Sequence, residues 1–191
     1  MHREAGLGRT PHHAMTAHDV VDLLALLGDA GIQAWLDGGW AVDAALEAET
    51  RPHDDLDLVV ALDDVERLQA ALAGRGYVVA RGEPPQSLEL VDPEGRQIDV
   101  HPVTFTERGD GLYRMENGED WLYAAEGFTG LGGILDTPVR CLTPEVQMLC
   151  HTDYPPHRGS FDDVWALSHR FGIPVPPSYR RPRESYRLRT P

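Results

Sequence analysis

The residues best suited to chemistry lie between positions 37 and 57. Asp55 and Asp57 are separated by one residue at the start of the apolar run 56–60. Alternate residues of a strand point to the same side, so the two carboxylates should converge. Ionised neighbours repel unless one is protonated or a cation lies between them, and Mg²⁺ is often held by one or two carboxylates plus substrate phosphates. An Asp-x-Asp pattern alone is more often a solvated strand start or turn, so it needs support from the rest of the chain.

A glycine pair and a third acid supply that support. Gly38-Gly39 follows an expected strand and precedes an expected helix, where glycine lets the backbone approach a ligand and the helix N–H groups favour anions. Asp99 is a lone acid within the apolar segment 97–103. If its strand lies beside that of Asp57, three acids share one cleft. A phosphate cradle next to a divalent-metal site is the combination required for phosphoryl or nucleotidyl transfer.

Two interpretations are open for several of the neighbouring polar residues. Arg51 is expected either to meet the β- and γ-phosphates of a nucleotide or to form a salt bridge with a nearby acid. His53 is expected to contact phosphate or to fix its loop through a hydrogen bond. Asp54 should point away from the pair, and Asp37 should brace the glycine turn. His101 shares a strand face with Asp99, so it either reaches the cleft or is a satisfied buried histidine.

The elements around these residues predict an α+β fold. Residues 16–103 follow the order α-β-α-β-α-β-β-β, which predicts a small mixed sheet with helices on one side. Thr16 is the expected N-cap of the first helix, and residues 87–91 and 97–103 form an expected hairpin. We expect four segments: a flexible tail 1–15, a core 16–105, an acceptor-side extension 106–173 and a Pro/Arg-rich extended tail 174–191. The extension should hold irregular strands and then helices, one of them over 161–171 with Val164, Trp165 and Leu167 inward.

Composition narrows the class of protein. The 191 residues carry 17 Lys+Arg and 31 Asp+Glu, a formal charge of −14. This balance argues against a nucleic-acid partner, since few counterions could be released. The absence of a long apolar run argues against a membrane span. Cys141 and Cys150 match no zinc spacing and suggest buried thiols in a reducing compartment, so a cytoplasmic protein is expected.

Two longer stretches carry a family resemblance. D-G-G-W-A-V-D-A-A-L (37–46) and T-R-P-H-D-D-L-D-L (50–58) resemble the minimal nucleotidyltransferases of the DNA-polymerase-β superfamily. In particular they are similar to the aminoglycoside 2″-adenylyltransferase and lincosamide nucleotidyltransferase group, as are I-D-V-H-P-V (98–103) and V-R-C-L-T-P-E-V-Q-M (139–148). The resemblance covers roughly residues 18–170 and implies the nucleotidyltransferase fold.

The resemblance also implies roles. Gly38 and Gly39 would hold the triphosphate of ATP or GTP, and Asp55 and Asp57 would bind catalytic Mg²⁺. Asp99 would be a third metal ligand or the base that deprotonates the acceptor. The reaction would move a nucleoside monophosphate to a hydroxyl of a small molecule, such as an antibiotic, and release pyrophosphate.

The sequence leaves the acceptor region and the alternative functions open. Trp121, Tyr123, Glu126 and Asp136 lie in the variable half where an acceptor would bind, and an acidic, aromatic pocket there would suit an aminated sugar. The arginines after residue 174 could pair with the acidic body or contact a second subunit in a homodimer. The alternative functions are a protein-modifying nucleotidyltransferase of the antitoxin type and a non-catalytic nucleotide-binding module.

Overall fold

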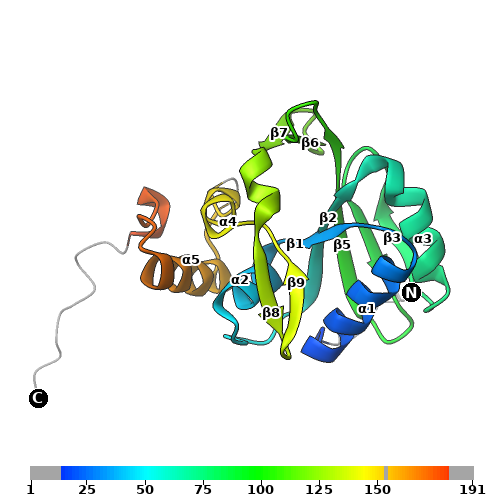
Figure 1. Ribbon diagram of the computed structural model, residues 1–191, viewed down its shortest axis with the longest axis horizontal. Coiled ribbons are helices and arrows are strands. Elements are labelled where there is room, and N and C mark those ends of the chain that lie inside the picture. Colours follow the sequence, from blue (N-terminus) through cyan, green and yellow to red (C-terminus); the bar gives the residue numbers. More distant parts are fainter. Residues whose placement is uncertain (1–13, 153–154, 181–191) are drawn as a thin grey trace, which may run out of the picture.

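The computed structural model describes residues 14–152 and 155–180, in which helices and strands first alternate and a run of strands then leads to two C-terminal helices (Figure 1). The helices are α1 (Ala17–Asp29), α2 (Gly38–Leu46), α3 (Val65–Ala73), α4 (Pro144–Cys150) and α5 (Arg158–Phe171). The strands are β1 (Ala34–Leu36), β2 (Asp55–Ala61), β3 (Val78–Gly82), β4 (Leu88–Val91), β5 (Gln97–Phe105), β6 (Gly111–Arg114), β7 (Asp120–Tyr123), β8 (Leu131–Ile134) and β9 (Thr137–Arg140). Short 3-10 turns cover Leu62–Asp64, Ala125–Thr129 and Pro177–Tyr179.

Seven of these strands form one mixed sheet. Its main path runs β1-β2-β5-β4-β3, and the β6–β7 hairpin is attached to the far end of β5. Among the described strands β2 and β5 make the parallel pair, with Asp57 opposite Asp99, and the other pairings are antiparallel. The predicted mixed sheet and the order of elements in residues 16–103 are therefore confirmed.

Apolar periodicity explains how the first three helices cover the sheet. Leu56, Leu58 and Val60 of β2 point into one buried cluster to which α1, α2 and α3 all contribute. The first of these helices begins as expected, because Thr16 and Asp19 cap it reciprocally through side chain and backbone. Val59, which points the other way, packs in a second cluster with residues of β7 and α4.

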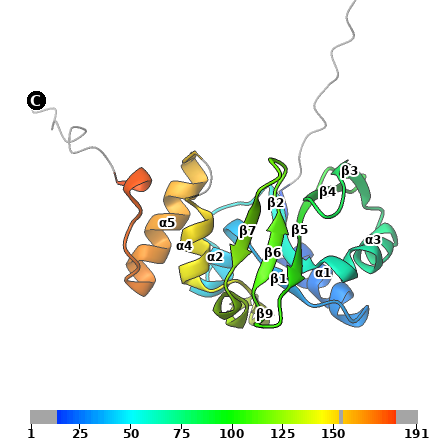
Figure 2. The same cartoon turned by 90° about the horizontal axis from the view of Figure 1, so that it is seen from above.

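The second half of the chain is more regular than the sequence suggested. Its strands pair as two hairpins, β6–β7 on the main sheet and β8–β9 as a separate two-stranded sheet against α2. Both α4 and α5 pack on α2 at the end of the molecule opposite α3 (Figure 1; Figure 2). The turns at Gly109 and Gly118 both have positive φ, which lets short strands reverse where composition alone suggested loops.

The C-terminal helix α5 and the segment after it differ from expectation. The helix begins at Arg158 rather than at residue 161, and Trp165 is 45 % exposed although it was expected to face inward. At about 100° per residue, Trp165 lies roughly 160° around the helix from Leu167, so it points away from the buried face that Leu167 shares with Val164. Tyr179 is fully buried within the segment that was expected to be extended.

The ends of the chain are described only in part. Residues 1–13 of the expected N-terminal tail and residues 181–191 of the Arg-rich tail lie outside the described residues. Met15 is buried, and its N–H donates to the His53 carbonyl at 3.0 Å. Across the described ranges, no helix combines the length and the apolar character needed to cross a bilayer.

Candidate active site

A cavity of about 560 Å³ opens where the sheet meets the C-terminal helices. Its walls come from the N-terminus of α2, the start of β2, the β6–β7 hairpin, α4 and α5. The segments between residues 37 and 57 that sequence patterns singled out thus meet elements from the far end of the chain. A second cavity, of about 150 Å³, lies beside it on the β4 side.

Asp55 and Asp57 both line the larger cavity, as their i, i+2 spacing on β2 predicted. Burial, followed by the charges of Asp99 and Asp54, raises the pKa of Asp55. Burial and the neighbouring Asp55 charge likewise raise the pKa of Asp57, against the opposing contact with His101. Two carboxylates whose charged forms are disfavoured in this way would be relieved by a cation between them.

Asp99 lies opposite Asp57 in the parallel β2–β5 pair, so their side chains share one face of the sheet. Its carboxylate accepts a hydrogen bond from Gln97 Nε2 at 3.0 Å and opens into the smaller cavity. Burial and the charge of Asp57 raise the pKa of Asp99 to about 6. The three acids that the sequence singled out are therefore neighbours on two adjacent strands, although Asp99 faces a separate opening.

His101 connects the two cavities. It lines both, and its Nε2 lies 3.4 Å from Asp57 Oδ1. Burial would lower the pKa of His101, but the Asp57 contact and the charge of Asp37 raise it to about 9. The sequence left open whether His101 reaches the cleft or is a satisfied buried histidine, and in the structure it lines the cleft.

The glycine pair was expected to precede a helix, and it forms the first two residues of that helix, α2. Asp37 is the N-cap and accepts from the Gly38 N–H at 2.7 Å, from Gln147 Nε2 at 2.7 Å and from Tyr123 Oη–H at 3.3 Å. Gly38 has φ +58, and a Cβ there would lie 2.2 Å from Asp57 Oδ2. A side chain at this position would therefore displace a carboxylate of the site.

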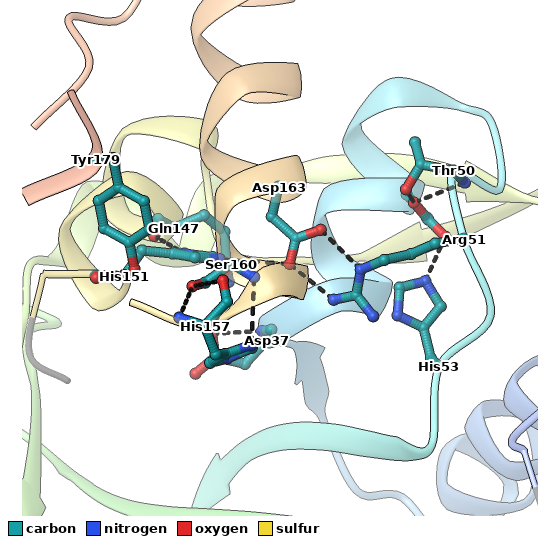
Figure 3. Close-up of polar contacts among 12 residues, drawn as sticks. Asp37, Thr50, Arg51, His53, Gln147, His151, His157, Ser160, Asp163 and Tyr179 are labelled. Atoms are coloured by element: carbon teal, nitrogen blue, oxygen red, sulfur yellow. Dashed lines mark hydrogen bonds and ion pairs between the residues drawn. The ribbon is translucent and has the colours of Figure 1, made fainter. Parts of the chain in front are cut away.

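Arg51 forms the salt bridge that was one of its two readings, and it also lines the cavity. Its Nε and Nη2 donate to the two carboxylate oxygens of Asp163, at 3.2 and 2.7 Å (Figure 3). The guanidinium therefore stands between the loop that leads to β2 and the C-terminal helix α5.

His53 takes up the loop-fixing contact. Its side chain is 2 % exposed, and its Nε2 lies 2.5 Å from Asp43 Oδ2. Asp43 also accepts hydrogen bonds from the N–H and the hydroxyl of Thr50, and the His53 ring lies against Trp40. These contacts tie the loop before β2 to α2, and His53 is not among the described residues that line the cavity.

Some cavity residues were foreseen only as a region, and others not at all. Trp121 and Tyr123 line the cavity, as does Asp54, which lies just before β2 and so escapes the strand alternation that was expected to turn it away. Glu126 and Asp136 are not among the lining residues. The lining residues that sequence reasoning missed are mostly on the β6–β7 hairpin, α4 and α5: Tyr113, Met115, Gln147, Cys150, His151, His157, Gly159 and Asp163. Within the described ranges, no three His, Cys, Asp or Glu side chains form a complete metal-binding group.

Comparisons with known proteins show the family of this chain. The model of the aminoglycoside-2″-adenylyltransferase family matches residues 19–165. A lincosamide resistance protein of Staphylococcus haemolyticus is 25 % identical over 140 residues, which are 73 % of this chain and 86 % of that protein. A 2″-aminoglycoside nucleotidyltransferase of Klebsiella pneumoniae is 38 % identical over 122 residues, 62 % of this chain and 63 % of that protein.

Solved structures share the fold. The lincosamide adenylyltransferase LnuA with bound lincomycin has a TM-score of 0.73 at 24 % identity, over 82 % of this chain and 98 % of that one. ANT(2″)-Ia in complex with adenylyl-2″-tobramycin has a TM-score of 0.62 at 21 % identity, over 80 % and 87 %. The nucleotidyltransferase fold and the enzyme class predicted from the sequence are confirmed, and the chain belongs to the aminoglycoside-2″-adenylyltransferase family.

Proposed function

We propose that this nucleotidyltransferase moves a nucleoside monophosphate from ATP or GTP to a hydroxyl of a small antibiotic and releases pyrophosphate. The observation that carries the proposal is the meeting of Asp55, Asp57 and Asp99 on adjacent strands beside the N-terminus of α2. None of the described arginine side chains forms a salt bridge with these three acids, and Asp57 has only the longer contact with His101. Such acids, next to a backbone that favours anions, suit a metal-bound nucleotide.

The donor set fits Mg²⁺. Asp55 and Asp57 supply carboxylate oxygens on one face of β2, and phosphate oxygens of the substrate would complete the coordination, as is usual for this ion. Asp99 opens into the smaller cavity and is assigned the role of the base rather than that of a third ligand. When bound, Mg²⁺ would neutralise charge on the phosphate oxygens and make the α-phosphorus more electrophilic.

Backbone and side-chain groups of the protein bind the phosphates and accept the proton of the acceptor. The Gly38 N–H already donates to Asp37, so at the glycine pair the Gly39 N–H would hold a phosphate oxygen, and the absence of a side chain at Gly38 would let the phosphates approach. Arg51 supplies a fixed positive charge beside them. The acceptor hydroxyl attacks the α-phosphorus, and Asp99 accepts its proton. The new O–P bond forms as the bond to the β-phosphate oxygen breaks, and its electron pair leaves with pyrophosphate. A base with a pKa of about 6 is ionised at neutral pH and still able to take a proton.

The opposite wall of the cavity indicates the kind of acceptor. Tyr113, Met115 and Trp121 form an aromatic and thioether surface on the β6–β7 hairpin. Two of the other lining acids are already engaged, Asp37 as an N-cap and Asp163 with Arg51. This favours a hydroxylated acceptor with an apolar face and few amino groups. A lincosamide fits that description better than an aminoglycoside does.

The test is an acceptor screen read by mass. Purified protein with Mg²⁺ and ATP or GTP is incubated with lincosamides and aminoglycosides, and a gain of one nucleoside monophosphate is sought together with pyrophosphate. Asp55→Asn and Asp99→Asn should each reduce turnover by at least about 100-fold. Asp63→Asn, an exposed acid just beyond β2, makes the same chemical change and should leave turnover intact.

The negative outcomes separate the alternatives. Label entering a protein band instead of a small molecule would favour the antitoxin-type activity. Binding of Mg²⁺–nucleotide without any transfer would favour a non-catalytic module. If Asp55→Asn transferred as fast as the wild type, the assigned metal site would be wrong.

A further inference from the structure

The charge of the cavity makes one side chain unusual. Arg51 is the only arginine or lysine among the described residues that line it, whereas five aspartates do so. A nucleoside triphosphate brings several negative charges into this space. The position of the single permanent cation therefore matters more than it would in a basic pocket.

That position is set from the far end of the chain. Asp163 of α5 has a side chain only 3 % exposed, and it holds Arg51 through two hydrogen bonds, from Nε to Oδ1 and from Nη2 to Oδ2 (Figure 3). Nε2 of His151, the C-cap of α4, lies 3.5 Å from the same Oδ2. Burial alone would raise the pKa of Asp163, but the hydrogen bonds from His151 and Arg51 hold it below its usual value. Asp163 is thus a buried, charged anchor.

Two glycines leave room for the guanidinium. A Cβ on Gly39 would lie 2.8 Å from Arg51 Nη2, and a Cβ on Gly159 would lie 3.2 Å from Arg51 Cζ. The guanidinium therefore crosses from the first turn of α2 to the first turn of α5. One N–H of Nη1 donates to the Pro52 carbonyl at 3.2 Å, which leaves the remaining N–H groups available to a ligand.

We propose that Asp163 is a positioning residue for the nucleotide. It fixes the Arg51 guanidinium against the glycine end of α2, so that the remaining N–H groups of Arg51 meet the β- and γ-phosphate oxygens of the NTP. The inference rests on the proposed function. It gives α5 a role in nucleotide binding, although residues 106–173, which include α5, were expected to form the acceptor side of the site.

The first experiment replaces the anchor. Asp163→Asn removes the carboxylate that orients Arg51, and the KM for the nucleotide should rise roughly tenfold, the loss expected for a charge-assisted hydrogen bond. The kcat and the KM for the acceptor should change by less than about twofold, because the lost interaction is uniform binding of the nucleotide. Asp163→Glu should restore part of the affinity. The matched control is Asp162→Asn, an exposed acid one position away on α5.

A double-mutant cycle tests whether Asp163 acts through Arg51. In an Arg51→Lys background, where the two-pronged contact is lost, adding Asp163→Asn should change the nucleotide KM by less than about twofold. If the two effects multiply instead, the positioning role is wrong.

A third variant perturbs Arg51 without touching Asp163. Gly159→Ala places a methyl group against the guanidinium and favours the helix, so it should also raise the nucleotide KM while the protein stays folded. This variant keeps the proposal falsifiable if Asp163→Asn does not fold, since an unchanged nucleotide KM in folded Gly159→Ala protein would count against it.

A binding measurement separates this inference from the proposed function. Calorimetric titration with Mg²⁺ and a non-hydrolysable ATP analogue is carried out on the wild type and on Asp163→Asn. A wild type that neither binds the analogue nor modifies any acceptor would overturn both proposals. A wild type that binds, with Asp163→Asn binding equally tightly, would overturn only the role of Asp163.

Discussion

Replacing Gly38 by alanine should separate the stability of this fold from the geometry of its site. Gly38 has φ +58, and Gly31, in the turn between α1 and β1, has φ +71. Alanine in such a conformation costs roughly 1–2 kcal/mol. Gly31→Ala should therefore lose about that much free energy of unfolding, which corresponds to roughly 2–8 °C in Tm for a chain of this size, and Gly38→Ala should lose at least as much.

The two positions differ in what the new methyl group meets. At Gly31 there is no atom within 4 Å, whereas at Gly38 the Cβ would lie 2.2 Å from Asp57 Oδ2 and 3.0 Å from Asp57 Cγ. Asp57 must therefore move by on the order of 1 Å, and a misplacement of that size can cost about 100-fold in rate. We expect Gly38→Ala to lose on the order of 100-fold in kcat/KM and Gly31→Ala to keep wild-type activity.

The assays are thermal unfolding and steady-state transfer to the acceptor found in the screen. A folded Gly38→Ala protein that has lost activity, beside a Gly31→Ala protein that has kept it, would support the assigned contact between the glycine turn and Asp57. The reasoning would be refuted if Gly38→Ala kept its kcat/KM, or if Gly31→Ala lost as much activity as Gly38→Ala does.

Three further predictions concern stability, pH and thiol reactivity. Asp43→Ala should lower the free energy of unfolding by about 2–4 kcal/mol, because it leaves the buried His53 ring without its Asp43 partner and also removes two hydrogen bonds from Thr50. Urea denaturation would measure this loss, and one below about 0.5 kcal/mol would contradict it. With a chelator present, the free energy of unfolding should fall as pH rises from 5 to 9. The pKa values of Asp99, about 6, and of His101, about 9, are raised in the folded state, so over this range the folded state binds more protons than the unfolded one. A urea midpoint that rises over this range would show the opposite sign. Cys141, buried and with its pKa raised by burial to about 11, should resist iodoacetamide in the native protein at pH 8, as mass spectrometry would report, and rapid alkylation would contradict its burial.

Local patterns located the acids but could not bring them together. The two-residue period of a strand was enough to place Asp55 and Asp57 on one side. That Asp57 lies opposite Asp99 depends on the parallel β2–β5 pairing, which joins segments about 40 residues apart and which no local signal determines. From the sequence alone, we could predict that the three acids meet only if the strand of Asp99 lies beside that of Asp57.

The residues of α5 could not be assigned to the site from the sequence for a different reason. Ser160, Asp163 and Leu167 lie at spacings of three and four and are all buried, so the acid occupies the inward face of a helix. A charged residue within an apolar stripe is a usable signal, because burial requires a partner. The sequence alone does not say which cation is the partner. The expectation that Trp165 faces inward was wrong because it rested on the apolar character of Trp165 and not on its angular position around the helix.

The contact between Arg51 and Asp163 joins residues separated by 112 positions, and this fixes an order of events during synthesis. A ribosome that adds 5–20 residues per second delivers Asp163 roughly 6–20 s after Arg51. Until then the nascent chain can pair its acid-bearing strands, but the only arginine of the described cavity wall has no carboxylate from α5 to hold it. The emergence of α5 from the exit tunnel therefore completes the cavity, and a polypeptide released before that point lacks one of its walls.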